Sequence, residues 1–149
     1  MNNRFSDNGE ILRDFGNYRI VECPNCLKPI DYHPPRLVCT HCGYNKEFKK
    51  QNMLYQIYPE TSIELKDYLI NSCCKHNFWA QNLEHLIFLE DYVKAKLRER
   101  KPNRNKSVAS RLPIWMKDAK NRDEILKAIN GLKTKLEKNG YRKTLPNKV

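Results

Sequence analysis

The stretch CPNCLKPIDYHPPRLVCTHC occupies residues 23–42 and contains two Cys-x-x-Cys pairs separated by twelve residues. Two residues between cysteines let the backbone turn tightly, so both sulfur atoms of a pair point at one position. Two such turns supply the tetrahedron of thiolates that a structural zinc ion takes. The predicted ligands of one structural Zn²⁺ are therefore Cys23, Cys26, Cys39 and Cys42.

A centre with four thiolate ligands has no open coordination position for a water molecule. We therefore expect the zinc ion to be structural and not catalytic. Two histidines, His33 and His41, lie close to the cysteines in the sequence. The four sulfurs already satisfy the metal, so we expect both histidines to be bystanders and His41 to lie at the surface.

The segments that flank the cysteine pairs have the composition of short strands. Residues 19–22 and 27–32 flank the first pair, and residues 36–38 and 44–48 flank the second. A zinc ribbon consists of two strand–turn–strand units, and we predict one over residues 19–50. Gly43 follows the last cysteine and supplies the backbone freedom that such a turn needs.

The rest of the chain predicts an α+β protein with an N-terminal four-cysteine zinc ribbon, a short β region and C-terminal basic helices. We divide it into a polar, at most partly ordered segment (1–18), the ribbon (19–50), a β-hairpin region plus helical basic region (51–140) and a flexible tail (141–149). Strands are expected at residues 53–58 and 63–65, followed by a hairpin over residues 68–80 with its turn near residues 75–77.

Helical periodicity begins after Asn82, a favourable N-cap residue, and predicts a helix over residues 83–100 that ends before Pro102. A short helix is expected near residues 113–119. A further helix is expected to begin after Asn121, where Glu124 completes a capping-box pattern, and to end at residues 139–140.

The net charge of +11 is distributed unevenly. Residues 1–93 contain 10 Lys/Arg and 12 Asp/Glu, a net charge of −2, whereas residues 94–149 contain 18 Lys/Arg and 5 Asp/Glu, a net charge of +13. Such asymmetry indicates a polyanionic partner, because neutralising phosphates releases condensed counterions. The alternative is a solvated helix face rich in lysine. The predicted nucleic-acid-binding residues are Arg98, Arg100, Lys101, Arg104, Lys106, Arg111, Trp115 and Lys117.

Aromatic residues in this chain have two possible roles. Tyr44, Trp79 and Trp115 can stack on unpaired bases or can belong to the core. Trp115 lies between Arg111 and Lys117, so it is the aromatic residue that we assign to nucleic-acid contact.

Cys73 and Cys74 are adjacent and are not needed for the four-cysteine centre. They can form a redox switch or, with His76, part of a second metal site. In a strand, however, adjacent side chains point to opposite faces, and we expect one cysteine to be buried and inert.

Composition and missing motifs narrow the class of protein further. Six cysteines without an export signal favour metal ligation in a reducing compartment, so we expect a cytoplasmic protein. No apolar run is long enough for a transmembrane helix, and no membrane partner is expected. The phosphate-binding loop, HExxH, GxSxG and dinucleotide-binding patterns are missing, so we expect no enzyme activity and identify no small-molecule substrate. A small enzyme with an unrecognised site is the third hypothesis.

The cysteine motif CPNC with CTHCG resembles the zinc ribbons of transcription factor B-type proteins and of related transcription and replication subunits. The segments FWAQNLEHL (78–86), YVKAKLRER (92–100) and ASRLP (109–113) are similar to small bacterial zinc-ribbon proteins, which are also loosely likened to a primosomal helicase. The resemblance implies a bacterial zinc-ribbon protein but no particular reaction. The helicase function is not carried over, because this chain has no nucleotide-binding loop.

Two functions from different classes follow from these observations. The leading hypothesis is a non-enzymatic zinc-ribbon protein that binds DNA or RNA through a basic C-terminal helical surface. The alternative is a protein-interaction adaptor that docks a polymerase or another multi-protein assembly through the ribbon and the region around Trp79. Steep salt dependence would distinguish nucleic-acid binding from an apolar docking contact.

Overall fold

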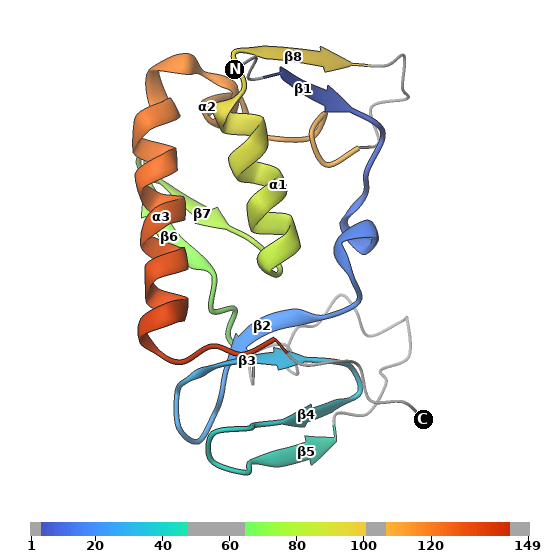
Figure 1. Cartoon of the computed structure of the whole chain (residues 1–149), viewed down its shortest axis with the longest axis vertical. Coiled ribbons are helices and arrows are strands. Elements are labelled where there is room, and N and C mark those ends of the chain that lie inside the picture. Colours follow the sequence, from blue (N-terminus) through green and yellow to red (C-terminus); the bar gives the residue numbers. More distant parts are fainter. Residues whose placement is uncertain (1–3, 48–64, 101–106, 144–149) are drawn as a thin grey trace.

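The computed structural model describes residues 4–47, 65–100 and 107–143 and has an α+β fold. Within these residues the strands form four separate two-stranded sheets. Three of the pairs are antiparallel, and the fourth joins the two strands β1 and β8 in parallel. Figure 1 shows two antiparallel pairs stacked at one end of the molecule, with the helices packed together at the other.

The four-cysteine unit, residues 19–47, consists of two antiparallel strand pairs. Strands β2 (Arg19–Glu22) and β3 (Pro29–Tyr32) form the first pair. Strands β4 (Arg36–Val38) and β5 (Asn45–Glu47) form the second. The predicted strands on either side of the cysteine pairs are confirmed. The predicted strand at residues 53–58 lies outside the described residues. So does the predicted strand at residues 63–65, except for Leu65, which is not part of a strand.

The predicted hairpin over residues 68–80 is also confirmed. It consists of β6 (Ile70–Cys73) and β7 (His76–Trp79), paired antiparallel. The turn comprises Cys74 and Lys75, with φ angles of 55° and 66°. Both central residues therefore adopt the left-handed conformation of a type I′ turn, whose twist matches that of the flanking strands.

The first long helix, α1 (Leu83–Lys94), is shorter than the predicted helix over residues 83–100. The Asn82 side chain caps its N-terminus by accepting a hydrogen bond from the His85 N–H at 2.9 Å, as predicted. The chain becomes extended at Ala95, and strand β8 (Leu97–Arg100) follows. Arg98 and Arg100 therefore lie on a strand and not on the predicted helix.

Tertiary pairing explains why the helix ends early. Strand β8 pairs in parallel with β1 (Arg4–Asp7), which belongs to the segment that we expected to be at most partly ordered. Phe5 of β1 is 8% exposed and packs edge-on against Phe88 and Tyr92 of α1, with ring centroids 5.2 and 5.1 Å apart. The N-terminal segment thus contributes a strand and a core residue, and it continues into the short helix η1 (Leu12–Phe15).

The remaining helices are α2 (Ile114–Lys117), η4 (Ala119–Asn121) and α3 (Arg122–Lys138). Their positions agree with the predicted helical segments, but the predicted capping box does not form. Asn121 makes no side-chain cap and instead donates from Nδ2 to the Trp115 carbonyl at 2.9 Å. Its side chain therefore joins α3 to α2.

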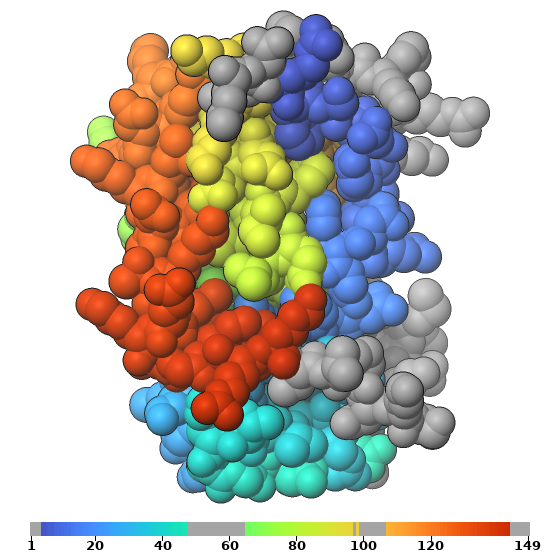
Figure 2. Space-filling model, viewed as in Figure 1, coloured from blue at the N-terminus to red at the C-terminus, as the bar shows by residue number. Residues whose placement is uncertain are grey.

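Residues 141–143 belong to the segment that we predicted to be a flexible tail, but the side chains of Tyr141 and Lys143 are anchored. The Tyr141 hydroxyl donates to Asp31 Oδ1 of β3 at 2.6 Å. Lys143 forms an ion pair with Glu84 at the start of α1. Figure 2 shows the chain after α3 lying across the boundary between the four-cysteine unit and α1.

Two apolar cores lie on either side of strand β2. Ile20 is fully buried in the larger core with α1, α3 and the β6–β7 hairpin, whereas its neighbour Val21 is fully buried in the smaller core of the four-cysteine unit. Adjacent residues of a strand point to opposite faces, so one short strand belongs to both cores. No helix within the described residues is long and apolar enough to cross a membrane.

Candidate metal centre and predicted nucleic-acid-binding residues

The two Cys-x-x-Cys turns have the same backbone hydrogen-bonding pattern. The Leu27 N–H donates to the Cys23 carbonyl at 2.9 Å, and the Gly43 N–H donates to the Cys39 carbonyl at 3.0 Å. Leu27 and Gly43 each follow the second cysteine of a pair, and both have positive φ angles, of 66° and 80°. The left-handed residue thus ends each turn and directs the chain into the returning strand.

The four sulfur atoms form a compact cluster. The Sγ atoms of Cys23 and Cys42 are 3.6 Å apart, as are those of Cys26 and Cys39. All four Sγ atoms lie within 4.8 Å of one another. A tetrahedron with Zn–S bonds of about 2.3 Å has sulfur–sulfur edges of about 3.8 Å, so the cluster has the size of a four-thiolate metal site.

Backbone N–H groups around the sulfurs favour thiolate ligands. The N–H groups of His41 and Cys42 both point to Cys39 Sγ, at 3.4 Å. Such donors partly neutralise the negative charge that accumulates when four thiolates share one divalent ion. The donor set and its environment therefore fit a soft or borderline divalent metal ion.

The surroundings of the free thiols shift their pKa values in opposite directions. Burial raises the pKa of Cys23 to about 12 and also raises that of Cys39. A hydrogen bond from the Asn25 side chain is the largest cause that lowers the pKa of Cys42, to about 6. A metal ion must displace the protons of the buried thiols, so its binding releases protons and weakens as the pH falls.

His41 is not the surface residue that we expected. Its side chain is half-buried, and Gly140 packs close to the imidazole ring. A methyl group added at Gly140 would lie 3.6 Å from His41 Cε1. Its Nε2 atom is buried and has no hydrogen-bond partner within the described residues. The reason is tertiary: the chain after α3 packs over the second cysteine turn, which a sequence pattern does not reveal.

Arg98, a predicted nucleic-acid-binding residue, makes contacts within the protein. Its guanidinium lies 4.2 Å from the centroid of the Tyr92 ring. Nε donates to the Tyr92 carbonyl at 3.1 Å, and Nη1 donates to the Lys117 carbonyl at 3.0 Å. Arg98 therefore joins the end of α1 to α2. The predicted phosphate contacts Lys101, Arg104 and Lys106 lie outside the described residues, and for Arg100 the structure describes only the backbone strand.

Arg111 and Trp115 lie on the wall of one large cavity of about 740 Å³. Lys117 lies with Arg98 on a smaller neighbouring hollow, and its Nζ donates to the Ser110 carbonyl at 3.2 Å. The described predicted residues thus separate into two pairs, Arg111 with Trp115 and Arg98 with Lys117.

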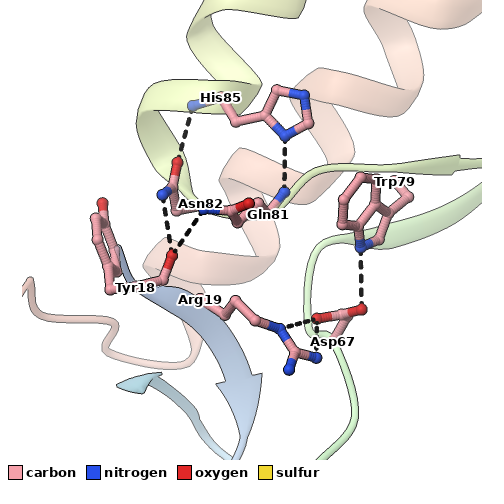
Figure 3. A network of polar contacts seen from close by, with 7 residues as sticks. All are labelled: Tyr18, Arg19, Asp67, Trp79, Gln81, Asn82 and His85. Carbon is pink, nitrogen blue, oxygen red and sulfur yellow. Dashed lines mark hydrogen bonds and ion pairs between the residues drawn. The ribbon is translucent and has the colours of Figure 1, made fainter. Parts of the chain in front are cut away.

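The lining also includes Arg13, Trp79 and His85, which were not among the predicted nucleic-acid-binding residues. Figure 3 shows how a polar network holds two of them. The Gln81 N–H donates to His85 Nδ1 at 2.9 Å, and Trp79 Nε1 donates to Asp67 Oδ2 at 3.0 Å. We predicted that Trp79 can stack on unpaired bases or belong to the core, and that its region docks a partner in the alternative function. Arg13 and His85 carried no sequence signal for this site.

Cys73 is buried, as we expected of one of the two cysteines, but the side chains of Cys73 and Cys74 do not point to opposite faces. Their Sγ atoms are 3.1 Å apart and lie within 4.8 Å of a carboxylate oxygen of Glu124. The positive φ of Cys74 rotates its side chain toward that of Cys73, because the residue belongs to the hairpin turn and not to the strand. His76, which we considered as a partner in a second metal site, is not part of this group of described residues.

Comparison with protein-family models, with curated proteins and with solved structures gives no match. The class of this protein therefore has to be defined from its fold and its cysteine cluster alone. The chain is an α+β protein with a four-cysteine cluster of the size that holds a metal ion.

Proposed function

We propose that this protein binds nucleic acid, DNA or RNA, without catalysing a reaction. The observation that carries the proposal is that Arg111 and Trp115 line the same cavity and belong to residues 94–149, which have a net charge of +13. A guanidinium offers a planar fork for phosphate, and an indole offers a face for a base. The described lining of this cavity contains two arginines and no acidic residue.

In this proposal the metal is one structural Zn²⁺ held by Cys23, Cys26, Cys39 and Cys42. The four-cysteine unit would then be a zinc ribbon that supports strand β2, through which it is joined to the larger core. The ligands leave no open position on the metal, so the zinc ion orders the chain and takes no part in binding. Thiols retained for a metal require a reducing compartment, so we place the protein in the cytoplasm.

The test is the salt dependence of binding. Zinc-loaded full-length protein is titrated into fluorescently labelled single-stranded DNA, duplex DNA and RNA, and binding is followed by anisotropy. The observed affinity should fall steeply between about 50 and 200 mM salt, because each neutralised phosphate contributes a slope of about −0.7 to −0.9 in the log–log plot.

A variant that lacks two of the proposed phosphate-binding cations is compared with a variant that lacks a cation elsewhere. Arg111→Ala combined with Lys117→Ala should reduce that slope by about 1–2, one phosphate for each lost cation. Lys28→Ala, an exposed change in the four-cysteine unit, should leave both affinity and slope unchanged. Failure to retain any DNA or RNA at about 50 mM salt would contradict the proposed function.

One observation favours the alternative function, a protein-interaction adaptor. Trp79 is 38% exposed and lines a cavity whose other walls are largely apolar, so the region offers an anchor site for an apolar side chain. An adaptor of this kind would bind its partner with little response to salt. The salt titration therefore separates the two functions.

A further inference from the structure

The cavity of about 740 Å³ is built by four segments that are distant in the sequence. They are η1, strand β7, helix α1 and the segment of residues 108–116, which contributes Val108, Arg111, Leu112, Pro113, Trp115 and Met116. The volume lies within the range of about 300–1,000 Å³ that is usual for small-molecule sites, so it suits a ligand of nucleotide size or larger.

Both tryptophans of the chain line this cavity, and each indole is held in place by its neighbours. Trp79 is fixed by its hydrogen bond to Asp67, which also accepts from Arg19. Trp115 is stacked on the imidazole of His76, with ring centroids 4.9 Å apart and an interplanar angle of 5°. Rigid indoles lose little conformational entropy when a flat ligand stacks on them.

His85 supplies a buried polar group at the cavity wall. Its side chain is 3% exposed, stacks on Phe15 at 5.3 Å and packs edge-on against Trp79 at 5.5 Å. Burial lowers the pKa of His85 to about 4, so the ring is neutral near pH 7. Nδ1 accepts from the Gln81 N–H, which leaves the proton on Nε2.

The Nε2–H group of His85 is therefore a hydrogen-bond donor on the side of the ring away from Gln81, as Figure 3 shows. Within the described part of the chain, Nε2 has no oxygen or nitrogen acceptor. Because His85 lines the cavity, a ligand with an acceptor atom can hydrogen-bond to this N–H group.

Charge complements these groups. Arg13 and Arg111 lie on the cavity wall, and the described lining includes no Asp or Glu. Arg13 is exposed, so its guanidinium remains in contact with water, whereas the side chain of His85 is buried. The cavity thus combines flat apolar faces, one imidazole N–H donor and two cations on its wall, the set of groups that a base, its acceptor atoms and its phosphate would meet.

We propose that this cavity receives unpaired bases and makes the protein selective for single-stranded nucleic acid. The inference rests on the proposed function and specifies its substrate class. Bases of the strand would stack on Trp79 and Trp115, a carbonyl oxygen or ring nitrogen would accept from His85 Nε2, and flanking phosphates would lie near Arg13 and Arg111. Paired bases in a duplex are stacked on one another and cannot enter.

The two tryptophans make the test direct, because all intrinsic indole fluorescence comes from the cavity wall. Zinc-loaded full-length protein is titrated with an oligothymidylate of about a dozen nucleotides and with a blunt duplex of the same length. The single strand should quench the tryptophan fluorescence saturably, and it should bind at least tenfold more tightly than the duplex. This measurement uses the unmodified protein, so it does not depend on how any variant folds.

Two variants locate the contact. Trp79→Leu and Trp115→Leu keep an apolar side chain but remove the aromatic face, and each should weaken single-strand binding about 5- to 150-fold, the equivalent of one lost stacking contact. The slope of log affinity against log salt should not change, because no phosphate contact is lost. Ile114→Ala, which changes an 85% exposed neighbour of Trp115 outside the cavity lining, is the matched control and should bind normally.

The possible failures are distinguishable. Equal binding of single strand and duplex, without quenching and without loss in the Leu variants, would overturn the base-binding cavity and leave the nucleic-acid proposal intact. No binding of either probe at about 50 mM salt would overturn both proposals. A shift of the tryptophan emission with an amphipathic leucine-rich peptide, but with no oligonucleotide, would assign the cavity to a protein partner and overturn the inference.

Discussion

Leu27 and Gly43 occupy equivalent positions in the two cysteine turns, although only one of them is a glycine. Each N–H closes its turn on the carbonyl of the first cysteine, and each residue has a positive φ angle. A side chain with a Cβ is strained in this conformation by about 1–2 kcal/mol. Leu27 is 61% exposed, so little burial compensates for the strain.

Replacing Leu27 by Gly should therefore stabilise the zinc-loaded protein by about 0.5–1 kcal/mol. The gain is smaller than the relieved strain, because glycine also increases the entropy of the unfolded chain. The free energy of unfolding in urea, at saturating zinc, measures the effect.

Gly43→Ala is the reciprocal control. An added Cβ would meet no atom within 4 Å at this position, so the substitution tests the backbone conformation alone. It should destabilise the protein by about 1 kcal/mol. A neutral or destabilising Leu27→Gly variant would show that the first turn is not strained at this residue.

At the scale of the elements, strand β1 determines where helix α1 ends. The sequence continues the helical pattern to residue 100, but β8 pairs with β1 and the chain leaves the helix at Ala95. Phe5 provides the packing contact, because its ring lies against Phe88 and Tyr92 of α1. Asp7, buried at the end of the same strand, accepts from the Ser107 hydroxyl at 2.6 Å.

Phe5→Ala should lower the free energy of unfolding by about 3–5 kcal/mol, the usual cost of removing a buried phenylalanine side chain. Thermal or urea unfolding, followed by circular dichroism, measures the loss. Ser6→Ala changes the exposed face of the same strand and should alter stability by at most about 0.5 kcal/mol. A loss below about 1 kcal/mol for Phe5→Ala would mean that β1 contributes little to the core.

At the scale of the whole molecule, strand β2 and the chain after α3 join the two cores. The smaller core contains Cys23 and Cys39, so we expect it to depend on the proposed metal, whereas the larger core contains none of the four predicted ligands. Asn139 donates to the Tyr68 hydroxyl, and Tyr141 donates to Asp31, which ties the end of α3 to both sides of the boundary.

Metal removal should therefore unfold one part of the molecule before the other. After chelation, or in the Cys42→Ser variant, hydrogen exchange should lose protection in residues 23–47 and retain it in α1 and α3. Native mass spectrometry should show one zinc ion in the unmodified protein and none in Cys42→Ser.

Cys74→Ser is the matched control for this experiment, because Cys74 lies outside the four-cysteine cluster. It should retain the zinc ion and the exchange pattern of the unmodified protein. An apo protein with full protection in residues 23–47 would contradict the structural role of the metal, and global loss of protection would contradict the independence of the larger core.

The sequence by itself determined the features that depend on local chemistry. The spacing of the four cysteines predicted the cluster, because a Cys-x-x-Cys turn brings its own two sulfurs together wherever it occurs. Local sequence also predicted the strands beside the cysteines, the β6–β7 hairpin and the N-cap at Asn82. Each depends on residues close together in the chain.

Only the tertiary structure decided the features that depend on distant partners. The end of α1 depends on β1, the partial burial of His41 depends on the chain after α3, and the contacts of Arg98 depend on α2. The cavity with Trp79, His85, Arg13 and Arg111 is built from four separate segments. Periodicity and composition carry no information about which distant segments meet, and so the residues that line the cavity became visible only in the folded chain.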